Sequence, residues 1–313
     1  MSQWFKDLAG EDFSKARTRA LLSRIANFLG PARDRLLPFE EVRRLLKPMR
    51  ETYEGVQAVA LDRIVGSEGR YRDFNRHFLP KHERLRDRWV SIDLAHYSDI
   101  ELPAIRLYEI GGLYFVRDGN HRVSVAAQRG QTHIDAEVTS LSAETILEPG
   151  MTIDDLRSQV IGWEKRDFYT NTSFGKLTGD EDLDFTTTGR YDEIMEHISV
   201  HKYYINQQSK AELPFWQALV SWYGNVYQPI ALAIDEAGLL DRFPKRTVSD
   251  LYVYVVKHWD ILKKKYSLSY SLAAAAKDYG KVYGPDSLPL LSRLLSRLRS
   301  IFGSSAKKGP PQP

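Results

Sequence analysis

One segment constrains the fold of this chain more than any other, because residues 114–130 combine a strand, a turn and a helix. Residues 114–117 are mostly aromatic and β-branched, which favours a strand, and Asp118–Gly119 is a turn signal. The helix that follows carries His121 and Arg122 in its first turn, where backbone N–H groups and the positive end of the helix dipole attract anions. The segment therefore predicts an anion site, and phosphate is the anion that we expect.

The same segment carries a family resemblance. The residues Asp118-Gly119-Asn120-His121-Arg122, followed by an expected helix over Val123–Arg129 and an expected strand over Ile134–Val138, resemble the ParB/sulfiredoxin superfamily. Partition proteins of that superfamily carry Gly-Glu-Arg-Arg at this place, sulfiredoxins carry Gly-Cys-His-Arg, and free-serine kinases carry Asp-Gly-His-His-Arg, the most similar of these patterns. The resemblance implies that Asp118, Gly119, Asn120, His121 and Arg122 bind the phosphate of a ligand.

A purely structural interpretation of these residues stays open. In that interpretation Asp118 caps the helix and Arg122 forms a salt bridge in an ordinary strand–helix unit. Gly119 is needed in either case, for a positive φ or for close approach of the backbone to another group.

A second part of the resemblance lies upstream, in residues 58–74, which look like the opening strand of the family and the loop behind it. By that resemblance Arg70 takes the place of an arginine in the partition proteins' Gln-Pro-Arg box and binds phosphate. Glu68 takes the place of the catalytic glutamate of the serine kinases. The alternative is a solvated polar loop that only joins two elements.

Two departures from the family restrict its chemistry. The chain has no cysteine, so sulfinic acid reduction of the sulfiredoxin type is excluded, and Asn120 stands at that position. Asn120 also replaces the glutamate of the partition proteins, and a neutral amide cannot anchor Mg²⁺ with charge. Hydrolysis of CTP is therefore disfavoured, whereas nucleotide binding is not. No helix-turn-helix pattern follows the domain.

Composition sets broader bounds on the 313-residue chain. Its hydrophobic fraction of 42% suits a packed core, and its net charge of +3 confines attraction to nucleic acid to local patches. The first residues lack the apolar run of a secretory signal peptide, and no stretch is long and apolar enough to span a bilayer. We therefore expect a cytoplasmic protein.

The pattern and the resemblance together predict an α+β protein in which a ParB/sulfiredoxin-like domain with a small mixed sheet precedes an all-α domain. In the second half, residues 189–192, 222–229 and 243–252, together with His197 and His201, resemble a helical domain that is fused to ParB-like modules in bacterial proteins, which implies a bacterial source. The expected parts are an N-terminal helical segment (1–55), the ParB/sulfiredoxin-like domain (56–140), a connector or lid (141–190), the helical domain (191–283), and a basic amphipathic helix with a disordered tail (284–313).

Local patterns add detail to this plan. Apolar runs on either side of Gly111–Gly112 predict a β-hairpin. Residues 89–94 are open to a strand or a helix start, and residues 165–188 predict a long polar loop or lid. A turn at Pro149–Gly150 and the Thr152 cap predict a helix start.

Two patterns in the helical half are given their plainer interpretation. Glu193, His197 and His201 share one helical face, which could hold a metal with further ligands, but we expect no metal site. Aromatic residues at helical spacing are expected in the core rather than on a base-stacking surface. They are Trp216, Trp222, Tyr223, Tyr227, Tyr252, Tyr254 and Trp259.

Three functions remain open at this stage. The first is a regulatory or DNA-associated protein that binds a nucleotide (CTP, ATP or ADP, with or without Mg²⁺) or another phosphorylated small molecule. The second is a small-molecule kinase of the free-serine-kinase type, with Glu68 as its catalytic residue. The third is a scaffold with a vestigial site. DNA and a second copy of the chain are open as partners, while contact of the C-terminal helix with a membrane surface is disfavoured.

Overall fold

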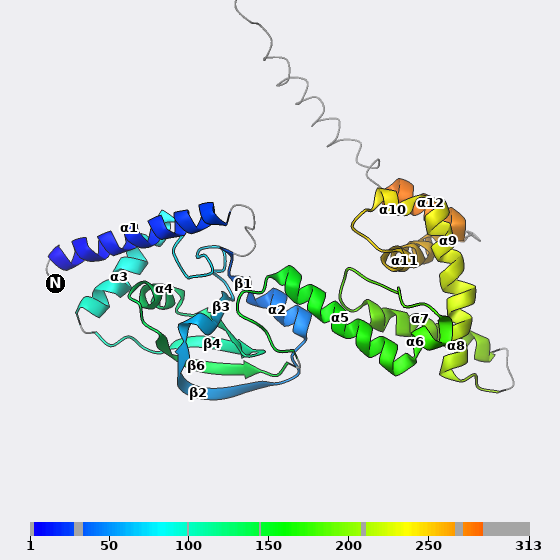
Figure 1. Cartoon of the computed structure of the whole chain (residues 1–313), viewed down its shortest axis with the longest axis horizontal. Coiled ribbons are helices and arrows are strands. Elements are labelled where there is room, and N and C mark those ends of the chain that lie inside the picture. The colour runs from blue at the N-terminus through cyan, green and yellow to red at the C-terminus, as the bar shows by residue number, and fades with distance from the viewer. Residues whose placement is uncertain are drawn as a thin grey trace, which may run out of the picture. The chain divides into compact units, whose positions relative to one another are not determined.

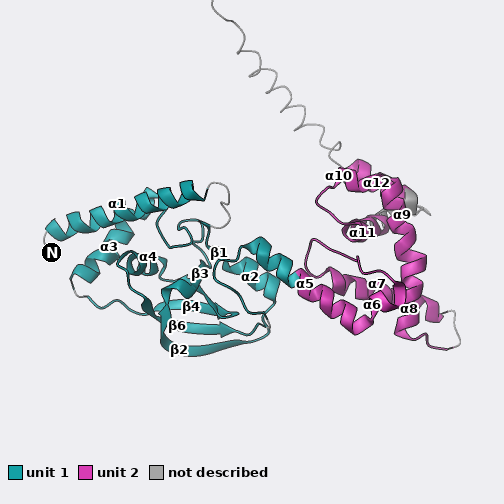
Figure 2. Cartoon of the chain, in the orientation of Figure 1, with its two compact units in different colours: residues 1–160 teal, residues 161–313 magenta. Residues whose placement is uncertain are grey.

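The computed structural model describes residues 3–27, 34–98, 100–143, 145–207, 211–266 and 272–283. The chain divides into two compact units, residues 1–160 and 161–313, which Figure 2 shows in different colours. The expected connector, residues 141–190, contains the boundary between them. The expected amphipathic helix and tail, residues 284–313, lie outside the described residues.

Unit 1 is built on a mixed six-stranded sheet with the order β1-β3-β5-β4-β6-β2. The strands are β1 (Leu37–Pro38), β2 (Glu51–Ala60), β3 (Ile64–Ser67), β4 (Ile105–Ile110), β5 (Leu113–Asp118) and β6 (His133–Leu141). β3 is parallel to both β1 and β5, β4 is antiparallel to β5 and parallel to β6, and β2 is antiparallel to β6. Because β3 and β5 are parallel neighbours, the segments that follow them leave the sheet at the same edge.

Helices cover both faces of this sheet (Figure 1). They are α1 (Gln3–Ala26), α2 (Phe39–Leu46), α3 (Arg86–Tyr97), α4 (Asn120–Gln128) and the start of α5 (Ile153–Thr172), with short 3-10 turns η2 (Leu61–Arg63) and η3 (Glu83–Leu85). On one face, α1, α3 and α4 add Phe13, Trp89 and Val123 to a buried apolar cluster. On the other face, α2 and α5 pack Phe39 and Leu156 against the sheet.

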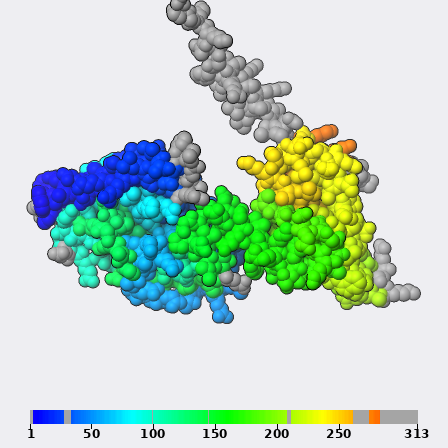
Figure 3. All heavy atoms as spheres, in the orientation of Figure 1, coloured from blue at the N-terminus to red at the C-terminus, as the bar shows by residue number. Residues whose placement is uncertain are grey.

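Side chains alternate along each strand, and this alternation decides which cluster a residue joins. Leu107 of β4 belongs to the cluster under α3 and α4, whereas its neighbour Tyr108 stacks on Phe39 of α2 with ring centres 4.4 Å apart. In the space-filling view, α1 lies along the border of unit 1 (Figure 3). Its outer apolar residues, including Trp4 and Ile25, are exposed.

Several local predictions of secondary structure in unit 1 are confirmed. The hairpin turns at Gly111–Gly112, α4 begins at Asn120, and residues 89–94 are helical in α3. The expected N-terminal helical segment, residues 1–55, needs correction because it also contains β1 and the start of β2. These strands depend on pairing with Gly66 and with β6, which local patterns do not reveal.

All the regular secondary structure in the described part of unit 2 is helical. After the end of α5 come α6 (Phe174–Thr178), α7 (Arg190–Gln207), α8 (Phe215–Trp222), a π-helical turn (Tyr223–Tyr227), α9 (Gln228–Glu236), α10 (Leu239–Arg242), α11 (Val248–Tyr266) and α12 (Leu272–Tyr283). The expected loop or lid over residues 165–188 is wrong in its first half, because α5 continues to Thr172 and α6 follows. Phe168 and Phe174 are buried in the core of unit 2, and this packing outweighs weak local helix propensity.

The aromatic residues of unit 2 form much of its core, as expected for Trp222, Tyr227 and Tyr252. Trp216 is an exception, since 52% of its surface is exposed. Among the described helices, none combines the length and apolar character needed to cross a membrane.

Candidate functional site

The parallel pairing of β3 and β5 brings the two parts of the sequence prediction together. Ser67, the last residue of β3, lies opposite Val116 of β5. The backbone N–H of Glu68 and the hydroxyl of Ser67 both donate to the Val116 carbonyl, at 3.0 and 3.3 Å. The loop that carries Arg70 therefore leaves the sheet beside the turn that starts α4.

The turn before α4 depends on glycine. Gly119 has a φ of +108°, and a Cβ added there would lie 2.4 Å from Cγ2 of Ile105. No side chain caps the helix. The first amides of α4 have no acceptor within the helix itself, so this end presents N–H groups and the positive end of the helix dipole.

Two side chains in the first turn of α4 are buried without being paired. Asn120 is 7% exposed and His121 is 9% exposed. Among the described residues, neither Oδ1 of Asn120 nor Nδ1 of His121 has a hydrogen-bond partner. A buried polar group without a partner destabilises the folded chain by about 1–3 kcal/mol, so this arrangement requires an explanation.

The imidazole of His121 is neutral at physiological pH. Burial, together with the positive charges of Arg70 and Arg88, lowers its pKa to about 4, against an opposing effect of Asp73. The ring also meets Phe74 edge-on, with ring centres 5.4 Å apart. His121 can therefore donate or accept one hydrogen bond at each nitrogen without bringing charge to the site.

Arginines surround this helix start. Arg70 and Arg84 both pair with Asp73, at 3.3 and 2.5 Å, and Arg88 acts on His121 through its charge. Three guanidinium groups against one carboxylate leave an excess of positive charge. We refer to the first turn of α4, with Asn120, His121 and Arg70, as the α4 site.

Arg122 lies in the expected place but contacts other atoms than the resemblance implies. Its guanidinium donates to the carbonyls of Pro103 and Ala104 and to the carboxylate of Asp118, the last at 2.6 Å. Its side chain is 14% exposed and that of Asp118 is 69% exposed. The ion pair agrees with the salt bridge of the structural interpretation, but that interpretation is wrong in expecting Asp118 to cap the helix. The bonds to the two carbonyls tie α4 to the segment before β4.

The carboxylate of Glu68 acts through its charge on Tyr108, a residue of the cluster under α2. Burial raises the pKa of Tyr108, and the carboxylate of Glu68 adds to that shift, which locates Glu68 near the cluster under α2. Arg117 lies over the same tyrosine ring, 5.4 Å from its centre.

The sequence did not indicate that Arg84 and Arg88 would lie near the α4 site, although both belong to a visibly charged stretch. Arg84 is linked to the site through its ion pair with Asp73, and the packing of α3 on α4 brings the charge of Arg88 to His121. The hydrogen bond from Nε1 of Trp89 to the Ser124 hydroxyl, 2.9 Å long, helps to fix that packing.

The Glu193, His197 and His201 side chains of α7 each contact protein groups. Glu193 pairs with Arg190 and Lys257, His197 contacts the hydroxyl of Tyr252, and His201 contacts the hydroxyl of Ser221. No group of three or more acidic or histidine side chains with metal-binding geometry occurs among the described residues.

Comparisons with protein-family models, curated proteins and solved structures gave no match to this chain. The assignment of a function therefore depends on the chemistry of the α4 site.

Proposed function

We propose that this protein is a ParB/sulfiredoxin-like regulatory module that binds a nucleotide through its phosphate groups at the α4 site. The observation that supports this most is an uncapped helix start that holds two buried atoms, Oδ1 of Asn120 and Nδ1 of His121, with no hydrogen-bond partner among the described residues. A ligand that supplies those partners removes a cost of about 1–3 kcal/mol for each group.

The donor and acceptor pattern narrows the class of ligand. The amides of the first turn and the guanidinium of Arg70 can only donate hydrogen bonds, whereas Oδ1 of Asn120 can only accept them. A suitable ligand has phosphate oxygens together with a hydroxyl, an amino group or a water bound to Mg²⁺. The nucleotides CTP, ATP and ADP have this combination.

Positive charge at the site comes from arginine and not from histidine. His121 is neutral near pH 7, so the phosphate charge is balanced by Arg70, Arg84, Arg88 and the helix dipole. The side chain of Arg70 is 52% exposed, which leaves it free to turn from Asp73 toward a ligand.

The carboxylates near the site favour binding over phosphoryl transfer. Asp73 accepts from Arg70 and Arg84, Asp118 accepts from Arg122, and Glu68 is associated with Tyr108. A kinase needs a carboxylate placed to receive a proton from the attacking hydroxyl. We therefore propose ligand binding without turnover.

The test is the thermal stability of the protein with CTP, ATP, ADP and GTP, each with and without Mg²⁺. A nucleotide at a hundred times its dissociation constant should stabilise the folded chain by about 2.7 kcal/mol. Arg70→Ala should weaken this effect. Arg63→Ala is the matched control, because Arg63 is exposed and precedes β3, whereas Arg70 follows that strand.

Two results would overturn the proposal. One is the absence of a shift with every nucleotide, and the other is an equal shift in wild type and Arg70→Ala. Turnover of ATP that disappears in Glu68→Gln would instead support the kinase.

A further inference from the structure

A cavity in unit 1 opens near the end of α4 that lies farthest from the α4 site. Its volume is about 710 Å³, and Ala127 and Gln128 from the last turn of α4 contribute to its lining. The cavity touches β3 at Ile64, where that strand begins, whereas Arg70 of the α4 site follows the end of the strand. The two places are therefore separate sites.

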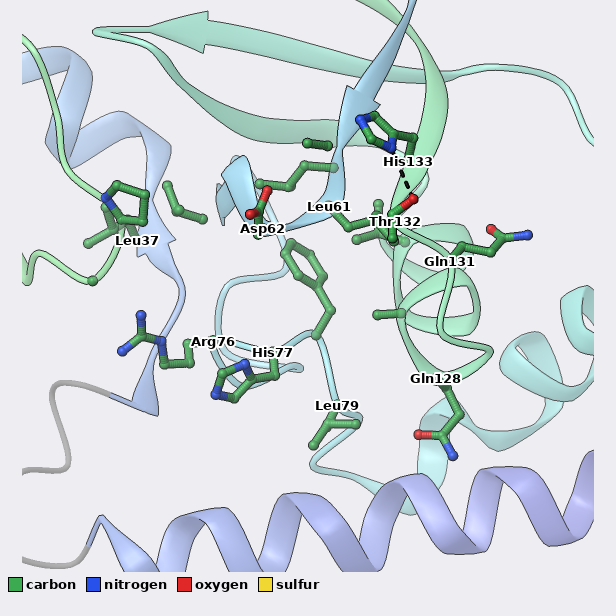
Figure 4. A pocket seen from close by; sticks show the side chains of 18 of the residues that line it. Leu37, Leu61, Asp62, Arg76, His77, Leu79, Gln128, Gln131, Thr132 and His133 are labelled. Atoms are coloured by element: carbon green, nitrogen blue, oxygen red, sulfur yellow. Dashed lines mark hydrogen bonds between the residues drawn. The ribbon is translucent and has the colours of Figure 1, made fainter.

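Side chains from several segments surround the opening (Figure 4). Arg76, His77 and Leu79 lie on one side, and Gln128 and Thr132 lie on the other. A cavity of this size is within the range of about 300–1,000 Å³ that is typical of small-molecule sites.

The polar part of the lining is mainly cationic. Arg19, Arg35 and Arg76 line the cavity, and Asp62 is the one acidic side chain among the described lining residues. Arg19 donates to Oε1 of Gln128 at 3.1 Å, and Arg35 has no ion pair or hydrogen bond from its side chain to a described residue. Because three guanidinium groups outnumber one carboxylate, the cavity attracts an anion.

One wall of the cavity is apolar and has a constrained backbone. Phe78 lines it with a φ of +54°, a conformation that bulky residues rarely adopt. The fully buried Asn75 fixes this loop, because its Oδ1 accepts from the N–H groups of His77 and Leu79, both at 3.0 Å. Val123 extends the apolar wall on α4. The wall is thus preformed for an apolar surface.

We propose that this cavity binds a small amphiphilic anion, a molecule with an apolar ring or chain and a single carboxylate, sulfonate or phosphate group. The apolar body packs against the partly exposed side chains of Leu61 and Leu79, and the anionic group pairs with Arg35. Bidentate pairing by arginine suits each of these anions. This proposal is independent of the nucleotide proposed for the α4 site.

The test uses two fluorescent molecules with the same apolar body. 8-Anilinonaphthalene-1-sulfonate is an amphiphilic anion, and N-phenyl-1-naphthylamine is its neutral counterpart without the sulfonate. Both are titrated into the full chain and into Ala127→Trp, which fills the cavity, and Arg35→Ala, which removes a cation. Arg70→Ala and Arg44→Ala are controls outside the cavity lining.

The sulfonate should bind once per chain, and Ala127→Trp should weaken that binding by roughly tenfold or more. Arg35→Ala should weaken it by about fivefold and leave binding of the neutral molecule unchanged. Gln131→Trp, at an exposed lining position, provides the decisive result if Ala127→Trp does not fold.

Unchanged affinity in the tryptophan variants would overturn the proposal. It would also be overturned if Arg70→Ala, and not Arg35→Ala, weakened binding, or if several molecules bound per chain without response to any variant.

Discussion

Helices α4 and α11 both start after a polar turn, but their first turns are completed in different ways. In α11, the Asp250 N–H donates to Oγ1 of Thr247, and the fully buried carboxylate of Asp250 accepts from the Thr247 N–H. The same carboxylate accepts from the N–H and hydroxyl of Thr186. In α4, Gly119 offers no side chain, and the buried Asn120 and His121 retain unpaired atoms.

The difference separates a helix start that is completed by its own side chains, as in α11, from one that is not, as in α4. The sequence supplies α11 with a capping pair that satisfies the N–H groups of Thr247 and Asp250 and also binds a neighbouring loop. At α4 the same amides are left for another acceptor, although capping residues would stabilise the helix by about 1 kcal/mol. A helix start that is buried, polar and uncapped is therefore suited to an external anion.

The largest loss of stability should come from removing the Asp250 side chain, which caps the start of α11. Asp250→Ala leaves the amides of Thr186 and Thr247 without their acceptor, and we expect the free energy of unfolding to fall by about 4–5 kcal/mol. Urea unfolding followed by circular dichroism measures this loss. Asp235→Ala, an exposed carboxylate on α9, should change stability by less than about 0.5 kcal/mol. Equal effects of the two substitutions would contradict the role assigned to Asp250.

A smaller loss of stability is expected when the glycine in the turn before α4 is replaced. Gly119→Ala forces a Cβ into a position 2.4 Å from Ile105 and strains a φ of +108°. The free energy of unfolding should fall by about 3 kcal/mol. Gly130→Ala is a useful comparison, because its φ of +74° is also positive but nothing lies within 4 Å of the added Cβ. If both variants lost the same stability, the contact with Ile105 would be unimportant.

The buried imidazole of α4 should make stability depend on pH. Above pH 6.5 His121 is neutral in both states, but below it the unfolded chain gains a proton that the folded chain takes up only near its pKa of about 4. Stability should therefore fall as the pH decreases from about 6.5 to 4, by at most about 3 kcal/mol.

Other groups also titrate in this range, so the variant His121→Gln isolates the contribution of His121. Wild type should lose more stability than the variant between pH 7 and pH 4, as measured by urea unfolding at both values. Parallel losses in the two proteins would show that His121 ionises as readily in the folded chain as in the unfolded one.

The smallest effect on stability is expected at Asn120. Asn120→Ala removes a buried oxygen that has no hydrogen-bond partner in the described part of the chain, so the unfolding free energy should stay constant or rise by up to about 1 kcal/mol. Stabilisation by the nucleotide should be weakened in the same variant, because the ligand loses an acceptor. A loss of more than about 1 kcal/mol without ligand would show that Asn120 serves the fold itself.

The sequence was informative where local chemistry decides the structure. Gly111–Gly112 and Asp118–Gly119 marked the hairpin and the start of α4 because turns depend on few neighbouring residues. β1 could not be foreseen, since a strand of two residues exists only through its pairing with Gly66 and Ser67.

The residues of the α4 site were predictable in part, because some of them are set by the local sequence. Asn120 and His121 follow directly from the motif, whereas the role of Arg122 depends on the carbonyls of Pro103 and Ala104, which the fold brings close. The nearness of Arg88 to His121 likewise arises from helix packing. Local sequence identified the helix start, and tertiary structure selected the cations around it.

The central claim is that the first turn of α4, unlike that of α11, binds phosphate oxygens. The most direct measurement follows the ¹H–¹⁵N NMR signals of both first turns while CTP, ATP or ADP is added with Mg²⁺. The amide signals of Asn120, His121 and Arg122 should move downfield and saturate with one of these nucleotides, while those of Ser249, Asp250 and Leu251 stay in place. If the α4 amides do not respond to any of the three, or respond no more than those of α11, the claim is contradicted.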